Sequence, residues 1–390
     1  MKRLLSLSLI FLPFSMAFSQ PLTSLNFREW YNPDSEIQFS FQVVKEINQI
    51  KVYYLLEAKQ FPVDKYSLSW EKRDAFTQQQ GTALSKPDST SATTTDKTKG
   101  GSFIFEIPAK PWLLVAKITN TESKISWTYI KLIEPKYPVN GWLETNSERV
   151  AQKYVIINKE YAVQVTGPAA SPLFVSFYKT DFPAASPPFA DLEKKPDRFM
   201  FYDSSFRVNP GSKFTPQKPG LYLFQQDTNA AEGFAFRCVN EIYPKFSKIS
   251  DLIGPMIFVT TQDEYTALLN TQGEKAKFDK VILDITGDQD RAKNFIRNYF
   301  RRVELANIYF SSFKQGWKTD RGMIYLIFGI PDEVSMNDGT EIWFYKNSRQ
   351  SFTFVKSGSV YDPENYVLLR DKRFMEPWFS KVDLLRKSRF

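Results

Sequence analysis

The stretch QGWKTDRGMIYLIFGIPDE, residues 315–333, determines the fold that we expect for the last third of the chain. Its first half is rich in glycine and charge, and its second half contains an apolar run over residues 323–328. Short apolar runs bounded by turn residues are typical of buried strands. We therefore predict a strand over 323–328, followed by three further antiparallel strands at residues 341–345, 351–355 and 366–369.

Each residue of this stretch has a structural explanation. Gly316 can adopt the left-handed conformation that ends a helix, and Thr319 and Asp320 can accept backbone N–H bonds in a turn. Arg321 can pair with Asp320 or with another carboxylate, and Gly322 would lead the chain into the predicted strand. The candidate site residues, with a structural or partner-binding role, are Gly316, Trp317, Thr319, Asp320, Arg321, Gly322, Gly329, Pro331 and Asp332.

The same stretch can also be interpreted as a catalytic or cation site. Asp320 lies at one end of the predicted strand, and Asp332 and Glu333 lie at the other. Paired carboxylates can do acid–base chemistry or bind a cation. A seven-residue strand would hold its ends ~20 Å apart, which exceeds the separation of ~5–9.5 Å between the carboxyl groups of glycosidases. We therefore favour the structural interpretation.

A long amphipathic helix is predicted over residues 288–313, directly before this stretch. Its apolar residues recur in steps of three and four and so share one face: Phe295, Ile296, Tyr299, Phe300, Val303, Ala306, Phe310 and Phe313. Lys293, Arg297 and Arg301 form a basic stripe beside that face, and we favour a solvated helix side over an anion-binding surface.

Two shorter helices complete this part of the chain. Thr261 and Glu264 form a capping-box pattern that predicts a helix through Leu269. Residues 376–390 have apolar side chains at helical spacing in a basic context, so we expect a C-terminal helix that docks by its apolar face.

The stretch 315–333 resembles the signature of the GWxTD-domain family, exported proteins found chiefly in Bacteroidota and related bacteria. Residues 301–307 (RRVELAN) and 341–345 (EIWFY) are further matches, and the resemblance covers about residues 245–390. Residues 278–286 depart from the family, which often has an acidic stretch with Trp and Arg before the helix. The family has no established activity, so the resemblance implies a domain and an envelope location rather than a reaction.

Residues 20–137 are expected to form an antiparallel, Ig-like β-sandwich because they contain short strand-like segments without helical periodicity. The six predicted strands are 37–43, 51–56, 66–70, 103–107, 112–118 and 125–133. Residues 78–101 have no aromatic side chain and are rich in Thr, Ser, Gly and Lys, so we predict a disordered surface loop there.

A second sandwich is predicted over residues 138–245. Its predicted strands are 161–165, 173–178, 220–226 and 233–239. Residues 181–197 contain four prolines, which cannot form a central strand and therefore indicate a loop. Together with a GWxTD domain over 246–390, the fold class is mainly β with a C-terminal α+β domain.

The N-terminus is typical of a secretory signal. Residues 1–19 have a basic start, an apolar stretch and small residues before Gln20, so we expect cleavage there. The residue directly after the expected cleavage point is Gln20 and not a cysteine, so we expect an exported protein, periplasmic or outer-membrane associated, that is not a lipoprotein. Later segments are too polar for a transmembrane helix.

The composition excludes several kinds of chemistry. The chain has no histidine and one cysteine, Cys238, which rules out Ser-His-Asp and Cys-His catalysis and metal sites built on histidine or several thiolates. We expect no cofactor, and we expect Cys238 to be a buried apolar residue in a strand. The formal net charge of +8 fits contact with anionic glycans or lipid headgroups. We expect no nucleic-acid partner, because no recognition motif is present.

These features predict a non-enzymatic binding or scaffold protein of the cell envelope, with other envelope proteins as partners. Sandwich domains present edges and loops that partners can contact. The alternative is a carboxylate-dependent carbohydrate-active enzyme or a glycan-binding protein. The enzyme would need two acidic groups in one cleft, with a raised pKa on one of them.

Overall fold

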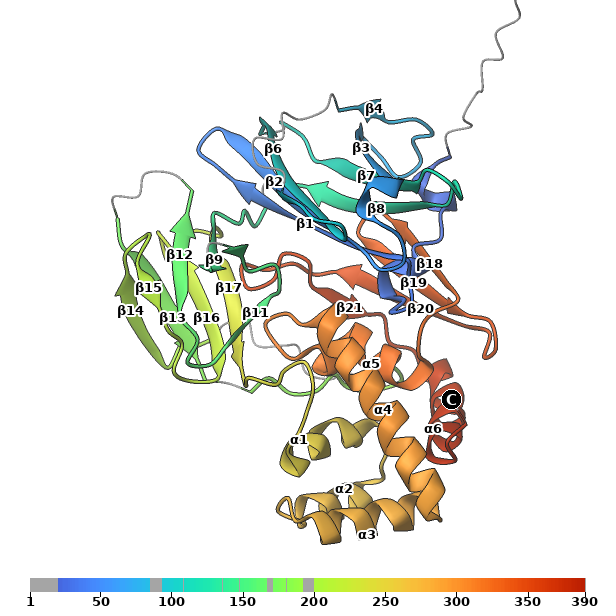
Figure 1. Cartoon of the computed structure of the whole chain (residues 1–390). Helices are drawn as coiled ribbons and strands as arrows, with labels where there is room; N and C mark the ends of the chain where they lie inside the picture. Colours follow the sequence, from blue (N-terminus) through green and yellow to red (C-terminus); the bar gives the residue numbers. More distant parts are fainter. Residues whose placement is uncertain are drawn as a thin grey trace, which may run out of the picture.

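The computed structural model describes residues 20–84, 93–107, 109–134, 136–146, 148–166, 171–179, 181–191 and 200–389. The predicted signal peptide lies outside these ranges, as do the middle of the predicted loop 78–101 and the end of the segment 181–197. The described residues form two β-sandwiches and a C-terminal domain of helices and one sheet (Figure 1). The predicted fold class is therefore confirmed.

The first sandwich packs two four-stranded sheets against each other. Its strands are β1 (Ile37–Lys45), β2 (Gln49–Ala58), β3 (Tyr66–Arg73), β4 (Thr82–Ala83), β5 (Thr93–Thr94), β6 (Thr98–Glu106), β7 (Trp112–Asn120) and β8 (Ser126–Ile133). The sheet orders are β1-β2-β6-β5 and β4-β3-β7-β8. Trp70 of β3 meets Phe103 of β6 across the core, with 4.8 Å between ring centroids. All six predicted strands lie within this sandwich.

The predicted loop 78–101 contains more regular structure than its composition indicates. Residues 82–83 form β4, residues 93–94 form β5, and residues 98–101 extend β6, where Gly101 pairs with Tyr54 of β2. The loop prediction is therefore wrong for these residues. β4 pairs with β3, the extension of β6 pairs with β2, and β5 pairs with that extension. These residues form strands despite their low strand propensity, which is a case of tertiary context overriding composition.

The second sandwich has one four-stranded and one five-stranded sheet. Its strands are β9 (Gly141–Thr145), β10 (Glu148–Arg149), β11 (Tyr154–Ile156), β12 (Tyr161–Val165), β13 (Leu173–Tyr178), β14 (Ser204–Val208), β15 (Lys213–Phe214), β16 (Gly220–Gln225) and β17 (Phe234–Val239). The orders are β10-β9-β12-β15 and β11-β17-β16-β13-β14. The expectation of a purely antiparallel arrangement is corrected at one place, because β11 pairs parallel to β17. Cys238 is buried in β17, as predicted.

The C-terminal domain places a helical layer against a four-stranded antiparallel sheet (Figure 1). Its helices are α1 (Ile249–Ile253), η4 (Gly254–Phe258), α2 (Gln262–Leu269), α3 (Lys275–Thr286), α4 (Gln289–Phe310), η5 (Gly316–Lys318), α5 (Asp320–Phe328), η6 (Lys372–Phe374) and α6 (Met375–Arg386). Its strands, in sheet order, are β18 (Glu333–Asn337), β19 (Thr340–Tyr345), β20 (Gln350–Lys356) and β21 (Tyr366–Leu368).

The predicted helices are present. The capping box at Thr261 and Glu264 begins α2. α4 buries Phe295, Tyr299 and Val303, and its predicted basic stripe is solvent-exposed. Helix α3, in the segment that departs from the family pattern, was not predicted.

The apolar run over residues 323–328 is a helix and not a strand. It forms most of α5, and its side chains from Met323 to Phe328 are all buried. A helix that is apolar on all sides is one surrounded by protein, and its hydrophobic pattern is the same as that of a buried strand. The predicted strand over 323–328 is therefore wrong, and so is the separation of ~20 Å that it implied.

The N-terminal segment, residues 20–34, packs between the C-terminal domain and the first sandwich. It carries the short helices η1 (Leu22–Ser24) and η2 (Arg28–Tyr31). Phe27 N–H donates to the carbonyl of Val334 at 2.8 Å, and Val334 N–H donates to Asn26 Oδ1 at 2.9 Å. These bonds satisfy the edge of β18, which would otherwise be open for pairing with another chain.

The first sandwich also contacts the C-terminal domain through the outer face of β7. Leu113 and Val115 belong to the core of the C-terminal domain, whereas Leu114 and Ala116 belong to the core of the sandwich. Both faces of β7 are thus buried. Trp30 of the N-terminal segment strengthens this contact, because its ring stacks on Tyr129 and its Nε1 donates to the carbonyl of Thr128 at 2.8 Å.

Leu22 provides a test of this packing. Its side chain has no exposed surface and lies in the core of the C-terminal domain. We expect Leu22→Ala to lower the free energy of unfolding by about 2–5 kcal/mol, because the substitution leaves a cavity. The matched control, Leu269→Ala, removes a leucine that is 52% exposed and should cost less than about 0.5 kcal/mol. Equal effects in urea unfolding would show that the N-terminal segment is not docked.

Candidate functional site

Gly316 and Trp317 join the start of η5 to the long helix α4. A Cβ atom on Gly316 would lie 2.0 Å from the carbonyl oxygen of Ala306, so no other residue fits at this contact. Trp317 N–H donates to Oδ1 of buried Asn307 at 3.2 Å. The expected helix-ending, left-handed role of Gly316 is therefore corrected: α4 ends at Phe310, and the glycine serves a close approach of two backbones.

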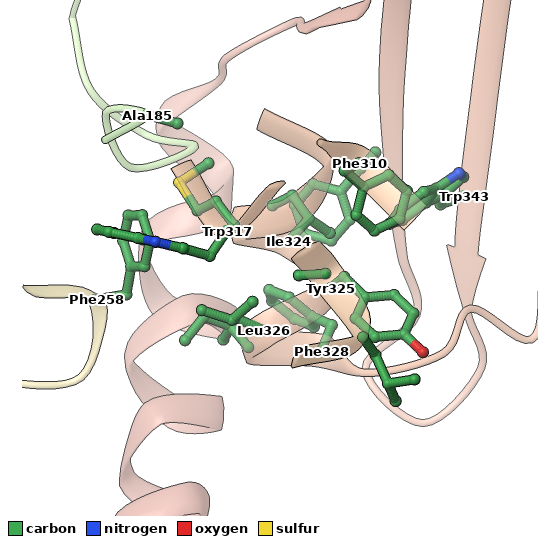
Figure 2. Packing of buried hydrophobic residues seen from close by; sticks show 14 of the residues in the cluster. Ala185, Phe258, Phe310, Trp317, Ile324, Tyr325, Leu326, Phe328 and Trp343 are labelled. Atoms are coloured by element: carbon green, nitrogen blue, oxygen red, sulfur yellow. The ribbon is translucent and has the colours of Figure 1, made fainter. Parts of the chain in front are cut away.

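The Trp317 ring packs inside the domain core. It is 4% exposed and meets Phe258 edge-on, with 6.0 Å between ring centroids. Figure 2 shows these two rings at one end of the cluster, with Tyr325, Phe310 and Trp343 at the other. The tryptophan is thus a packing residue rather than an exposed binding surface.

Thr319 begins helix α5. Its Oγ1 accepts from Gly322 N–H at 3.0 Å, which is an N-cap bond, and its hydroxyl donates to the carbonyl of Gly316 at 2.7 Å. A Cβ on Gly322 would lie 1.9 Å from that same carbonyl oxygen. The two glycines and the threonine therefore form one tight turn between η5 and α5.

Asp320 fixes the last strand of the sheet and a loop of the second sandwich. Its Oδ2 accepts from Leu368 N–H at 2.8 Å, and its Oδ1 accepts from Arg370 Nη2 at 2.6 Å. Arg370 also donates to the carbonyl of Ser186 at 3.0 Å. Next to it, the buried Lys318 binds Asp181 at 2.7 Å. The charges of Lys318 and Asp320 are therefore both paired with side chains from other elements of the chain.

Arg321 forms the most buried charge network of the motif. Its Nη1 lies 3.1 Å from Oε2 of Glu341 on β19, a carboxylate that is 1% exposed. Glu341 Oε1 accepts from Tyr31 Oη at 2.6 Å and from Trp343 Nε1 at 2.5 Å. The guanidinium also lies over the ring of Tyr366 at 4.4 Å. Arg321 therefore pairs with a distant carboxylate and not with Asp320.

The pKa values of this network are shifted by burial and by mutual contact. Burial raises the pKa of Tyr31 well above its usual value, and the adjacent Glu341 raises it further. Burial disfavours the charge on Arg321, but Tyr31 and Glu341 outweigh it and raise the Arg321 pKa. The tyrosine therefore stays a neutral donor and the arginine a permanent cation.

The remaining candidate residues shape the exit from α5. Gly329 has a φ of +82°, which favours glycine, and its carbonyl accepts from Tyr345 Oη at 3.0 Å. Pro331 is buried. Asp332 Oδ2 accepts from Lys346 N–H at 2.8 Å, and the Asp332 carbonyl accepts from Asn26 Nδ2 at 3.1 Å. Asp320 and Asp332 are thus held by different partners at opposite ends of the helix.

A family model of the GWxTD domain matches residues 220–387. The chain contains a GWxTD domain. The match confirms the resemblance seen in residues 315–333 and begins at Gly220, so it includes β16 and β17 of the second sandwich. A comparison with curated proteins returns no match.

The GWxTD-domain protein has a pocket of about 320 Å³ where its three parts meet. Its wall comes from β1 and β8 of the first sandwich, from the region around Trp142 and Phe236 of the second, and from residues 360–364 of the C-terminal domain. A second hollow of about 460 Å³ shares Lys153 and Asp362 with it and reaches Thr319 and Arg321 of the motif.

Charged side chains converge on this junction pocket. Lys153 binds Asp362, which is 2% exposed, at 2.5 Å, and Lys356 binds Glu134 at 3.3 Å and Glu364 at 3.5 Å. Burial raises the pKa of Glu364, but Lys131, Lys356 and Lys153 outweigh it, so the pKa is lowered overall. Sequence analysis missed these residues, because they lie in three different predicted domains and form no motif.

Among the described residues, no three Asp, Glu or Cys side chains converge as metal ligands would. Within the same ranges, no helix combines the length and apolar character needed to cross a bilayer.

Gly322 allows a sharp test of the turn. It lies in the first turn of α5, where helix propensity alone predicts that alanine stabilises by about 1 kcal/mol. Because the new Cβ would meet the Gly316 carbonyl, we expect Gly322→Ala to destabilise by about 2–3 kcal/mol instead. Gly100→Ala is the control, since its Cβ would meet nothing nearer than 3.4 Å. A gain of stability for Gly322→Ala in thermal or urea unfolding would contradict the packing described here.

Proposed function

We propose that this GWxTD-domain protein is a non-enzymatic binding and scaffold protein of the cell envelope, whose partners are other envelope proteins. The predicted signal at residues 1–19 supports an exported, periplasmic or outer-membrane location. The resemblance to exported Bacteroidota proteins supports the same location. Anionic glycans and lipid headgroups are further candidate partners, given the basic net charge of +8.

This proposal rests on one observation: the charged side chains of the motif form ion pairs with other side chains of the same chain. Lys318, Asp320 and Arg321 each bind a partner from another element of the chain: Asp181, Arg370 and Glu341 respectively. A catalytic motif would keep at least one such group directed at a substrate. The motif instead holds a loop of the second sandwich and the N-terminal segment on the C-terminal domain, which is what a scaffold requires.

The alternative of a carboxylate-dependent enzyme gains no support from these positions. Asp320 binds Arg370, and Asp332 binds the backbone of Lys346. In the junction pocket, the Glu364 pKa is lowered, whereas a general acid needs a raised one. A glycan-binding role remains a variant of the binding proposal.

The outer face of α6 is a surface suited to a protein partner. Met375 and Phe379 are 45% and 56% exposed, and residues four apart lie on the same side of a helix. The exposed cations Lys372 and Arg373 lie in η6, directly before α6, where they pair with Asp191 and Asp371. Apolar and aromatic side chains with a polar surround are typical of interfaces.

The test is purification of the native protein from the producing cells in mild detergent. We expect a partner of fixed stoichiometry, which the double variant Met375→Ser/Phe379→Ser should lose because it removes the apolar centre of the surface. Leu269→Ser, at an exposed leucine on α2, is the matched control and should retain the partner. Recovery of the native protein as a lone monomer would contradict the scaffold proposal.

A further inference from the structure

We propose that the junction pocket binds a small organic monoanion, a carboxylate on an apolar body, with Lys131 and Arg149 as the groups that receive its charge. This proposal goes beyond the scaffold role and does not depend on it, because the site lies within a single chain. It rests on the walls of the pocket, on the pairing of its charges and on its net charge.

The walls provide an apolar body with a place to lie. Aliphatic and aromatic side chains from all three parts line the pocket, among them Phe41, Leu132, Trp142, Phe236 and Val360. Its volume of about 320 Å³ lies at the lower end of the range for small-molecule sites, ~300–1,000 Å³. Mostly apolar walls with a few polar groups are the usual composition of such sites.

Three of the five cations that line the pocket already have carboxylate partners. Lys153 and Lys356 bind acidic groups of the pocket itself, and Lys45 binds Glu232 at 2.8 Å. These pairs hold the pocket together, and their charge is compensated. A ligand would gain little by competing with them.

Lys131 and Arg149 differ from the other three. Within the described residues, neither forms an ion pair within 4.0 Å. The Lys131 ammonium lies 5.9 Å from the ring centre of Phe41. The Arg149 guanidinium lies over the rings of Tyr53 and Trp142, at 4.3 and 4.6 Å, and its Nε and Nη1 are buried without a hydrogen-bond partner among the described residues. These two donors stay unsatisfied inside the protein, which adds to the cost of burying the Arg149 charge.

The shifted pKa values agree with this arrangement. Burial lowers the pKa of Arg149 to about 10, and neighbouring Tyr53 and Glu144 only partly offset it. Burial also lowers the pKa of Lys131; Glu364 offsets part of the effect, and Lys153 and Lys356 lower the value further. Burial is the first cause of the lowered pKa in both side chains, and a bound anion would favour the charged form of each.

The charge balance selects a monoanion. Five cations and three carboxylates line the pocket, which gives it a net charge of +2. Glu232, which pairs with Lys45 from outside this lining, compensates one of these charges. A dianion such as phosphate would meet the repulsion of Glu134, Asp362 and Glu364. A single carboxylate on an apolar body matches both the charge and the walls.

The experiment measures decanoate binding to the purified full chain by calorimetry, below the micelle concentration. Decanol tests the need for the charge, and acetate tests the need for the apolar body. We expect one decanoate site, with decanol and acetate at least about tenfold weaker, because a charge-assisted bond contributes about one decade or more in affinity. Decanoate binding no tighter than decanol would overturn the proposal.

Variants then locate the site. Lys131→Met removes the charge with little change of shape and should weaken decanoate at least about tenfold while leaving decanol unchanged. Lys117→Met, at an exposed lysine on the neighbouring strand β7, should change neither. Val360→Trp should block both ligands by filling the apolar space. Unchanged decanoate affinity in folded Lys131→Met, or in folded Val360→Trp, would overturn the proposal. The absence of an envelope partner in cells would not change these binding measurements. The scaffold proposal and the ligand-site proposal can therefore be contradicted independently of each other.

Discussion

The buried ion pair between Arg321 and Glu341 is the interaction on which the C-terminal half of the structure depends. Removing both charges from water is costly, and their attraction compensates only when the remaining donors and acceptors are also satisfied. Here Tyr31 and Trp343 donate hydrogen bonds to the Glu341 carboxylate, and aromatic rings lie beside the Arg321 guanidinium. The pair thus couples three separate sections of chain: the helix α5, the sheet strand β19 and the N-terminal segment.

The same logic extends through the whole GWxTD motif. Gly316 permits contact with α4, Thr319 caps α5, and Asp320 holds β21 together with Arg370. Each of these residues makes a different contact within one tightly packed turn. Their contacts give a physical reason for the spacing of the residues in the motif. Since these groups are used internally, the binding that we propose would use other surfaces. The junction pocket, with Lys131 and Arg149, and the outer face of α6, with Met375 and Phe379, are the surfaces that we propose for it.

The sequence predicted correctly those helices and strands whose pattern depends on neighbouring residues alone. The alternation in β1, the capping box at Thr261 and the apolar face of α4 all follow from neighbouring residues. Residues 323–328 were mistaken for a strand, because a short, wholly buried run has no periodicity that separates strand from helix. The partner of Arg321 and the lysines of the pocket could not be predicted, because Glu341, Lys131 and Lys356 are brought together only by the packing of distant segments.

A double-mutant cycle on Arg321 and Glu341 tests the central claim most directly. The free energy of unfolding would be measured in urea for Arg321→Met, Glu341→Gln and the double variant. If the pair is the structural joint, each single change should cost about 3–5 kcal/mol, because it leaves the other charge buried without its partner. The double variant should then cost less than the sum by about 1–3 kcal/mol. Single costs below about 1 kcal/mol, or additive costs within about 0.5 kcal/mol, would contradict the account.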